Sequence, residues 1–369
     1  MLGHVTPSPL PSRVVLAPHR PLLHRGGSAR QFGLAPHAAP VAEDLPPPLL
    51  ALVERLAAPT VTLDWVAEAA TRGVPVAMAE ELLEGLLTHG ALVDAAAGER
   101  RARRRAEALV VVRGDGPLAV GVAVALARAG VGGVHVHARG TVAGADIGCG
   151  YLAADVGRAR ADAAAAAVGR VGETTRTAPP PPGRRPDLVV LTDAVVPEPA
   201  VLDTLLGEGT DHLTVLVRDG AGVVGPLVLV RRSPCLRCVE LGRAGQDPGW
   251  PVVAAGLVGR SGSADPEAVA ATAALGAAQA LLALDGAAAG GRPPPTVGGA
   301  LELDPAGGTL YRRPWSAHPD CPCGASGADG TRAVDGTARV PRPRPETPVT
   351  EAGPGAMCAA VPNRETIMG

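Results

Sequence analysis

The sequence predicts an α/β fold with a mostly parallel sheet, preceded by a small helical domain and followed by a disordered tail. Over residues 108–324, apolar segments of strand length alternate with helical segments, as expected for a parallel sheet. A glycine-rich turn separates the first of these strands from the helix that follows it. Residues 325–369 are rich in Gly, Pro, Arg and Thr and lack hydrophobic periodicity, which indicates disorder.

The composition limits the function classes. A chain of 369 residues suggests two or three domains, and 46% hydrophobic with only 2% aromatic residues predicts a core of Ala, Val and Leu. All 34 basic residues are arginine, which excludes mechanisms that require lysine, such as Walker-type phosphate binding and Schiff-base chemistry. The formal net charge of −2 argues against nucleic acid as a partner.

The location is expected to be cytoplasmic, without a membrane partner. The first residues lack a basic segment followed by an apolar stretch, so no signal peptide is predicted. No stretch of 18 or more residues is apolar enough, and free enough of glycine, to predict a membrane span. In this compartment closely spaced cysteines indicate a metal site rather than a disulfide.

Residues 1–97 are predicted to form the small N-terminal domain. The pattern indicates a strand at residues 12–16, helices at residues 47–56, 63–71 and 78–88, and a strand at residues 91–93. This order is similar to a winged helix, a fold that binds nucleic acid or peptide. Glu80, Glu81 and Glu84 face outward on the third helix and disfavour a DNA recognition helix, so we expect a peptide-binding domain.

An arginine-rich linker is predicted over residues 98–107. The run contains Arg100, Arg101, Arg103, Arg104 and Arg105. Such a run is typical of a solvated linker or helix end, which we favour over a specific anion site.

The α/β domain, residues 108–324, opens with a turn that has a nucleotide-binding pattern. A strand, a helix and a second strand are expected at residues 109–112, 120–129 and 134–137. In the turn, Gly114, Gly116 and Ala119 fit G-x-G-x-x-G/A, where glycine permits a tight turn and a close approach of the backbone to phosphate. The same residues would also suit close packing of the helix on the strand, so both interpretations stay open.

The remaining elements complete the α/β domain. A strand at residues 187–191 ends in Thr192 and Asp193. Further strands are expected at residues 213–217 and 225–230, helices at residues 153–171, 200–207 and 266–284, and a hairpin at residues 301–311.

Four cysteines in two close pairs predict a metal site. Cys235 and Cys238 form C-x-x-C, and Cys321 and Cys323 form C-x-C. Four thiolates in this arrangement can surround one tetrahedral zinc ion and leave no open position, so the zinc would be structural. Two alternatives remain: unrelated pairs of reduced thiols, or a redox C-x-x-C. The redox alternative expects a helix start in a thioredoxin-like unit, whereas this motif follows a strand late in the domain.

The other candidate ligands have no such pattern. Cys149 and Cys358 lack a partner spacing and are interpreted as incidental. His318 lies close to Cys321 and would complete a zinc site if one thiol failed, although a solvated loop histidine is favoured.

The order of these features resembles that of the ThiF/MoeB family of adenylyltransferases, which are related to ubiquitin-activating enzymes. The features are the strand, glycine turn and helix, the strand ending in Thr192-Asp193, the P-C-x-x-C and the late cysteine pair. The segments SPCLRCVELGRAGQDPGWP and WSAHPDCPCG look closer to one branch, the ThiF-like leader-peptide-binding proteins associated with azole-forming peptide cyclodehydratases. The resemblance covers roughly residues 12–324. It implies a Rossmann-like sheet, a winged-helix-like N-terminal domain and a homodimer.

The resemblance implies that Mg-ATP adenylates a C-terminal carboxylate. The glycine turn is matched by Gly114, Gly116 and Ala119, and the acidic residue that helps hold magnesium is matched by Asp193. Several family groups are missing. Ala194 replaces the usual Asn, residues 137–140 (HARG) replace an acidic residue, residues 148–152 (GCGYL) replace N-x-x-R-Q, and the phosphate-binding lysine is absent.

Two hypotheses of different classes follow. The first is a zinc-stabilised scaffold with a degenerate nucleotide site, which binds a peptide as an added strand at residues 14–16 or in a helical groove. The second is an active adenylyltransferase acting on a peptide or small carrier protein, with Asp193 and arginines replacing the lysine. For a third class, a nicotinamide-dependent oxidoreductase, the glycine turn is the only supporting feature. The missing acidic residue near position 138 argues against this class.

Overall fold

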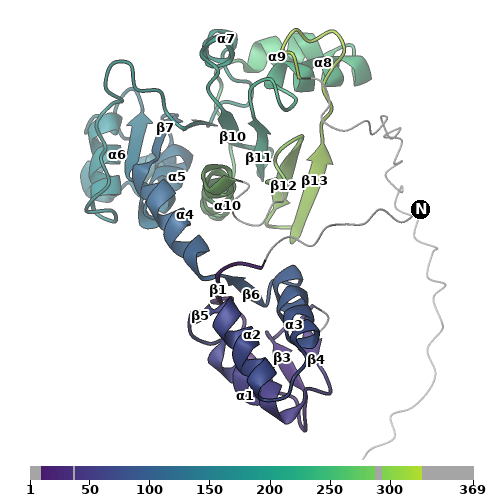
Figure 1. The fold of residues 1–369 in the computed structure, drawn as a ribbon. Helices are drawn as coiled ribbons and strands as arrows, with labels where there is room; N and C mark the ends of the chain where they lie inside the picture. Colours follow the sequence, from purple (N-terminus) through teal and green to yellow (C-terminus); the bar gives the residue numbers. More distant parts are fainter. Residues whose placement is uncertain (1–9, 36–37, 287–292, 326–369) are drawn as a thin grey trace, which may run out of the picture. The chain divides into compact units, whose positions relative to one another are not determined.

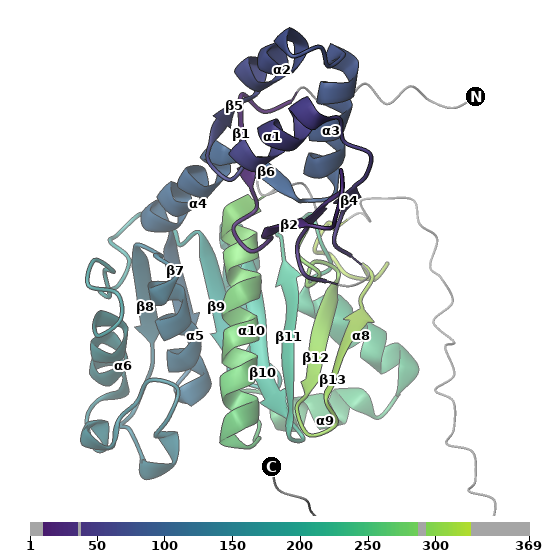
Figure 2. The same ribbon diagram turned by 90° about the horizontal axis from the view of Figure 1, so that it is seen from below.

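The computed structural model describes residues 10–35, 38–286 and 293–325 (Figures 1 and 2). The predicted disordered tail lies outside the described residues from position 326 onward, as does Cys358.

The N-terminal part contains a helical core with a three-stranded sheet. Its helices are α1 (Pro47–Arg55), α2 (Thr62–Thr71) and α3 (Val76–Thr88), and its sheet has the order β5 (Thr60–Val61), β1 (Arg13–Leu16), β6 (Leu92–Asp94). Trp65 is fully buried in this core and donates its indole N–H to the carbonyl oxygen of Leu52 at 3.0 Å. Because β1 is the central strand and pairs on both sides, the peptide strand suggested for residues 14–16 has no edge to join.

A second small sheet was not predicted. It has the order β2 (Leu22–His24), β3 (Arg30–Phe32), β4 (Val41–Ala42), with antiparallel pairing. Its strands have two or three residues, too few to show alternation in a segment rich in glycine. Phe32, the only phenylalanine of the chain, is fully buried and anchors this sheet to the helical core.

The arginine-rich segment predicted as a linker is a helix, α4 (Ala95–Glu107). The Asp94 side chain caps it by accepting the amide N–H of Ala96 at 2.9 Å. Near its other end, Arg105 makes a two-point ion pair with Asp285, with N···O distances of 2.9 and 2.6 Å. At least one arginine of this segment, Arg105, thus makes a structural ion pair, whereas a solvated run was predicted.

The α/β part is built on a seven-stranded sheet (Figure 2). Its strands are β7 (Leu109–Arg113), β8 (Gly133–His137), β9 (Leu188–Thr192), β10 (His212–Arg218), β11 (Ala221–Val228), β12 (Gly299–Asp304) and β13 (Thr309–Pro314). The order is β13-β12-β11-β10-β9-β7-β8. Strands β8, β7, β9 and β10 are parallel, and β11, β12 and β13 continue the sheet with antiparallel pairing, so the sheet is mixed.

Alternating strand residues pack against two helical layers. Val190 belongs to the cluster with α5 (Pro117–Arg128), α6 (Arg160–Gly169) and α10 (Pro266–Asp285). Its neighbours Val189 and Leu191 belong to the cluster with α7 (Pro199–Glu208) and α8 (Leu236–Gln246). Because successive side chains of a strand point to opposite faces, the sheet is buried on both sides here, which explains the continuous apolar runs.

Three segments differ from the predicted elements. The helix expected over residues 153–171 is the 3-10 turn η2 (Ala153–Asp155) followed by α6, and Gly157 between them has a φ of 86° that a helix cannot accommodate. A further 3-10 turn, η1 (Gly144–Asp146), precedes it. Helices α8 and α9 (Trp250–Leu257) were not predicted, because cysteine, glycine and proline interrupt their patterns.

Helix α10 is long and apolar enough to cross a membrane by length and composition alone, with a mean hydropathy of 1.5. In the structure it lies over the sheet (Figure 2) and packs against α5, β10 and β11. Buried small residues such as Ala273, Gly276 and Ala277 permit this close approach.

Candidate functional site

The two predicted cysteine pairs come together in one cluster. Cys235 is the N-cap of α8 and Cys238 lies in its first turn, while Cys321 and Cys323 lie in the loop after β13. The sulfur atoms of Cys235 and Cys321 are 3.6 Å apart, those of Cys238 and Cys323 are 3.6 Å apart, and those of Cys235 and Cys238 are 3.9 Å apart. All four lie within 4.8 Å of one another.

This geometry fits a tetrahedral zinc ion. Zinc–thiolate bonds of about 2.3 Å place neighbouring sulfurs about 3.8 Å apart in a tetrahedron, close to the observed separations. Burial raises the pKa of the Cys235 thiol, so without a cation this thiol would stay protonated. A zinc ion would supply the charge that four thiolates require, and its closed ligand set would serve structure rather than catalysis.

The remaining cysteine and histidine candidates lie outside this cluster. Cys149 is half-buried and has a left-handed backbone with a φ of 48°. His318 accepts the amide N–H of Asp320 through Nδ1 at 3.2 Å and does not join the four thiols. The argument that the position of the C-x-x-C disfavours redox chemistry was wrong, because this motif does begin a helix, α8. The two further sulfurs beside it favour a metal site.

The glycine turn and Asp193 also lie together. Strand β7, the turn and α5 have the predicted order, and Gly116 is the N-cap of α5. The amide N–H of Gly116 donates to Oδ2 of Asp193 at 2.9 Å, and the amide of Asp115 also donates to this carboxylate. Asp193 follows β9 in a left-handed conformation with a φ of 69°. Desolvation raises the pKa of the Asp193 carboxyl against the effect of these amide hydrogen bonds.

The turn is shaped by this internal contact. A Cβ atom at Gly114 would lie 1.8 Å from the Thr192 hydroxyl oxygen, so glycine is required there by the neighbouring strand end. Ala119 is fully buried within α5. In a nucleotide site the free amides of such a turn bind phosphate, whereas here one carboxylate accepts two of them. The packing interpretation of the glycines therefore has direct structural support.

The space beside this turn is small and is lined by side chains of both charges. Its cavity has a volume of about 120 Å³, below the roughly 300 Å³ at which small-molecule pockets begin. Arg113, His137 and Arg139 line it together with the acidic residues Asp115, Asp193 and Glu198. The amide N–H of Arg139 donates to Asp115 at 2.6 Å, so the segment that replaces the family's acidic residue is tied to the turn.

A larger cavity lies in the N-terminal part, between β4 and α3. It has a volume of about 500 Å³. Leu45 and Leu49 are buried at its floor, and Leu82 and Leu86 face it from α3. Glu43, Asp44 and Glu81 also line it. Strand β4 pairs with β3 on one side, and within the described ranges its other side pairs with no strand.

The fold matches that of E. coli MccB. Its structures with MccA-N7isoASN and with ATP each align with a TM-score of 0.65 and 12% identity, over 85% of this chain and 100% of that chain. The structure of the microcin C7 biosynthetic enzyme MccB with N-formylated MccA gives the same values. A structure of PaaA aligns over 58% of this chain with a TM-score of 0.45, which is too weak to carry an argument.

The protein is therefore an α/β protein with the fold seen in MccB and with a four-cysteine cluster. At 12% identity the similarity establishes the fold alone. No protein-family model matches the chain, and no curated protein matches it in sequence.

Proposed function

We propose that this protein is a zinc-stabilised scaffold that binds a peptide for a partner modifying enzyme and does not adenylate it. The groove between β4 and α3 is the observation that carries the proposal. We place the protein in the cytoplasm, as a homodimer in a peptide-modification pathway, with an azole-forming cyclodehydratase as the partner class that the sequence resemblance implies.

The groove suits an extended peptide. An unpaired strand edge offers backbone N–H and C=O groups to an added strand, and alternate side chains of that strand would enter the apolar floor beneath it. Met78, which is 46% exposed, lines the groove and provides a soft apolar contact. The carboxylates of Glu43, Asp44 and Glu81 favour a peptide that carries arginine or lysine beside its apolar residues.

The nucleotide site supports the scaffold over the enzyme. Adenylation depends on positioned charges at the phosphates, and the chain contains no lysine to supply one. The amides that would cradle a phosphate are already bonded to Asp193. The alternative, an active adenylyltransferase, is favoured by the retained turn and by Asp193 itself, which would have to turn from these amides toward a magnesium ion.

Peptide binding is tested with a defined probe. A 12-residue peptide selected against the protein from a random library is labelled, and its Kd is measured by fluorescence polarisation. Gly85→Trp should block the groove, because Gly85 lines it and no atom lies within 4 Å of a Cβ built at this position. Gly98→Trp on α4 is the matched control, since its Cβ is equally unhindered and lies away from the groove.

We expect Gly85→Trp to weaken the probe at least tenfold and Gly98→Trp to leave it unchanged. Glu81→Lys should weaken a basic probe, while Glu80→Lys, on the same helix but away from the groove, should not. Equal binding by all four variants would refute the groove as the peptide site.

Adenylation is tested by calorimetry with Mg-ATP on the zinc-loaded protein and by ATP–pyrophosphate exchange with the selected peptide. We expect neither heat nor exchange. Tight ATP binding that Asp193→Ala abolishes would establish the enzyme and overturn the second half of the proposal.

A further inference from the structure

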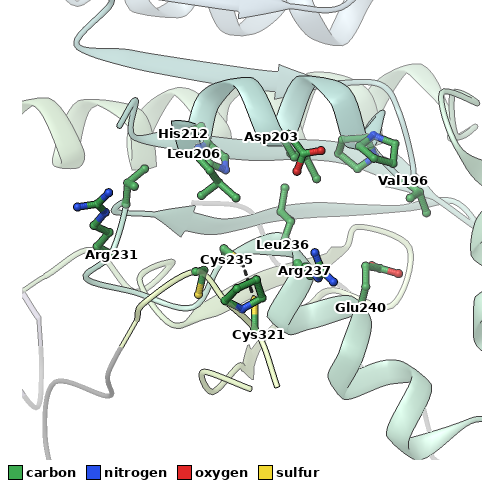
Figure 3. Close-up of a pocket in the computed structure, with 16 residues that line it drawn as sticks. Val196, Asp203, Leu206, His212, Arg231, Cys235, Leu236, Arg237, Glu240 and Cys321 are labelled. Carbon is green, nitrogen blue, oxygen red and sulfur yellow. Dashed lines mark hydrogen bonds between the residues drawn. The ribbon is translucent and has the colours of Figure 1, made fainter. Parts of the chain in front are cut away.

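A second cavity lies in the α/β part, away from the peptide groove. It has a volume of about 460 Å³, within the range of small-molecule sites. Figure 3 shows it between α7 and the start of α8, with Cys235 and Cys321 along one wall. It shares only Pro197 with the lining of the small cavity beside the glycine turn. Neither the glycine turn nor the peptide groove therefore accounts for it.

The walls of this cavity, which we call the α7–α8 cavity, are largely apolar. Leu202 and Leu206 face it from α7, and Val230 and Leu236 close it from the other side. An apolar body of ten to twenty heavy atoms would be desolvated here, which is the main contribution to small-ligand affinity.

One buried polar group faces the interior. His212 is 1% exposed and lines the cavity. Its Nδ1 lies 3.0 Å from the carbonyl oxygen of Thr210. A carbonyl only accepts hydrogen bonds, so Nδ1 carries the proton, and burial lowers the His212 pKa and keeps the ring neutral. Nε2 is then an acceptor, and no described residue donates to it.

Two guanidinium groups stand at the rim. Arg231 and Arg237 are exposed and line the cavity, and within residues 10–35, 38–286 and 293–325 neither makes an ion pair or side-chain hydrogen bond. Arg231 holds a left-handed backbone with a φ of 63°, where glycine would be less strained. Of the two lining carboxylates, Glu240 already accepts from Trp250 and Arg243. The two guanidiniums therefore face Asp203 and the sulfur atoms of Cys235, Cys321 and Cys323, which also line the cavity.

We propose that the α7–α8 cavity binds a small organic anion with an apolar body. Its anionic group pairs with Arg231 and Arg237 at the rim, its apolar body fills the space between α7 and α8, and a hydrogen-bond donor on the body reaches Nε2 of His212. The proposal is independent of peptide binding at the groove between β4 and α3.

The test uses two fluorescent probes of matched shape. 8-Anilinonaphthalene-1-sulfonate has an apolar body, one N–H donor and a sulfonate, and N-phenyl-1-naphthylamine has the same body and donor without the sulfonate. Each is titrated against zinc-loaded full-length protein and against the variants Arg231→Gly, Arg232→Gln, Leu206→Trp and Asp203→Trp. Folding and zinc content are measured for every variant.

We expect one sulfonate probe per chain, bound about tenfold more weakly by Arg231→Gly, while the neutral probe changes by less than about twofold. Arg232→Gln is the charge-matched control and should leave both probes unchanged, because Arg232 pairs with Asp211 and does not line the cavity. Leu206→Trp should remove both probes. Asp203→Trp fills the same space from an exposed position, so it gives the same test if Leu206→Trp fails to fold.

Three results would overturn the proposal. Unchanged binding in both tryptophan variants would place the probes elsewhere. Equal loss of the charged and neutral probes in Arg231→Gly would make this arginine structural. Release of zinc by Arg231→Gly with intact probe binding would show that the guanidinium serves the thiolates instead.

Discussion

The Asp193 side chain occupies backbone amides that the glycine turn would otherwise offer to a phosphate. The glycine turn has the spacing of a phosphate cradle, yet the amide of Gly116 donates to the Asp193 carboxylate at 2.9 Å. A phosphate would have to displace this internal anion and then lie beside it, which like-charge repulsion disfavours. The left-handed backbone of Asp193 directs the carboxylate inward, so the conformation and the contact depend on each other.

The cysteine cluster gives a prediction for a single thiol. Cys238→Ser should lower bound zinc from one ion per chain to less than about a tenth at sub-micromolar free zinc, because a hydroxyl is a poor zinc ligand. Zinc is measured by elemental analysis after dialysis. Cys149→Ser is the matched control, since Cys149 lies outside the cluster, and it should retain the full ion. Equal zinc in the two variants would contradict the assignment.

At the scale of elements, charged pairs connect segments that are distant in the chain. Asp285, at the end of α10, is buried and accepts two hydrogen bonds from Arg105 of α4. Arg104 donates to the carbonyl oxygen of the same residue. Helix α4 is thus held at the end of the helix that crosses the sheet.

Asp285→Asn should destabilise the protein by about 2 kcal/mol, because it removes the charge that pairs with the half-buried Arg105. The free energy of unfolding is measured by urea titration followed by circular dichroism. Asp162→Asn, an exposed aspartate on α6 without an ion pair in the part of the chain described, should change it by less than about 0.5 kcal/mol.

Glu302 connects three strands and gives the fold a dependence on pH. It accepts from Arg313 of β13 at 2.7 and 3.1 Å and from Arg218 of β10 at 3.1 Å. The hydrogen bonds from Arg313 are the main reason that the pKa of Glu302 lies below its ordinary value of 4.5. Because folding lowers this pKa, the stabilisation is complete above about pH 4.5 and is lost as the pH falls below it.

We therefore expect Glu302→Gln to destabilise the protein by about 1 kcal/mol at pH 7 and by less at pH 4. Urea unfolding at both pH values measures the difference. A difference that grows toward acid would contradict the sign of this pKa shift.

For the molecule as a whole, the cysteine cluster would act as a long-range cross-link when it holds a zinc ion. Cys235 and Cys321 are 86 positions apart, so a zinc ion would close a large loop that contains α9, α10 and the β12–β13 hairpin. Closing a loop of this size stabilises a folded chain by about 4.6 kcal/mol in the chain-entropy treatment of disulfides.

Removing zinc with a chelator should lower the thermal midpoint by roughly ten degrees or more for a cross-link of this strength. Differential scanning calorimetry with and without the chelator measures the shift. Cys235→Ser protein should already melt at the lower temperature and show no further change. If the chelator did not change the thermal midpoint of the wild-type protein, the cluster would have no role in stability.

The sequence predicted the features that depend on residue type and periodicity. Long apolar strands such as β9, the helix α10 and the grouping of the four thiols are visible in spacing alone. The β2–β4 sheet and α9 were missed because two-residue strands and an apolar helix containing Pro251 lack a periodic signature. The groove and the α7–α8 cavity were not predictable, since their walls come from segments joined only by folding.

The three tryptophans divide between the N-terminal part and the α/β part. Trp65 is buried within the helical core of the N-terminal part, whereas Trp250 and Trp315 both contact the Arg243 guanidinium, with ring centroids 4.9 and 5.4 Å from it. Each part thus contains its own tryptophan fluorophore. With Trp65 replaced by phenylalanine, the remaining emission would follow the α/β part alone, and comparing melts of the two proteins would reveal whether the two parts unfold together or in sequence.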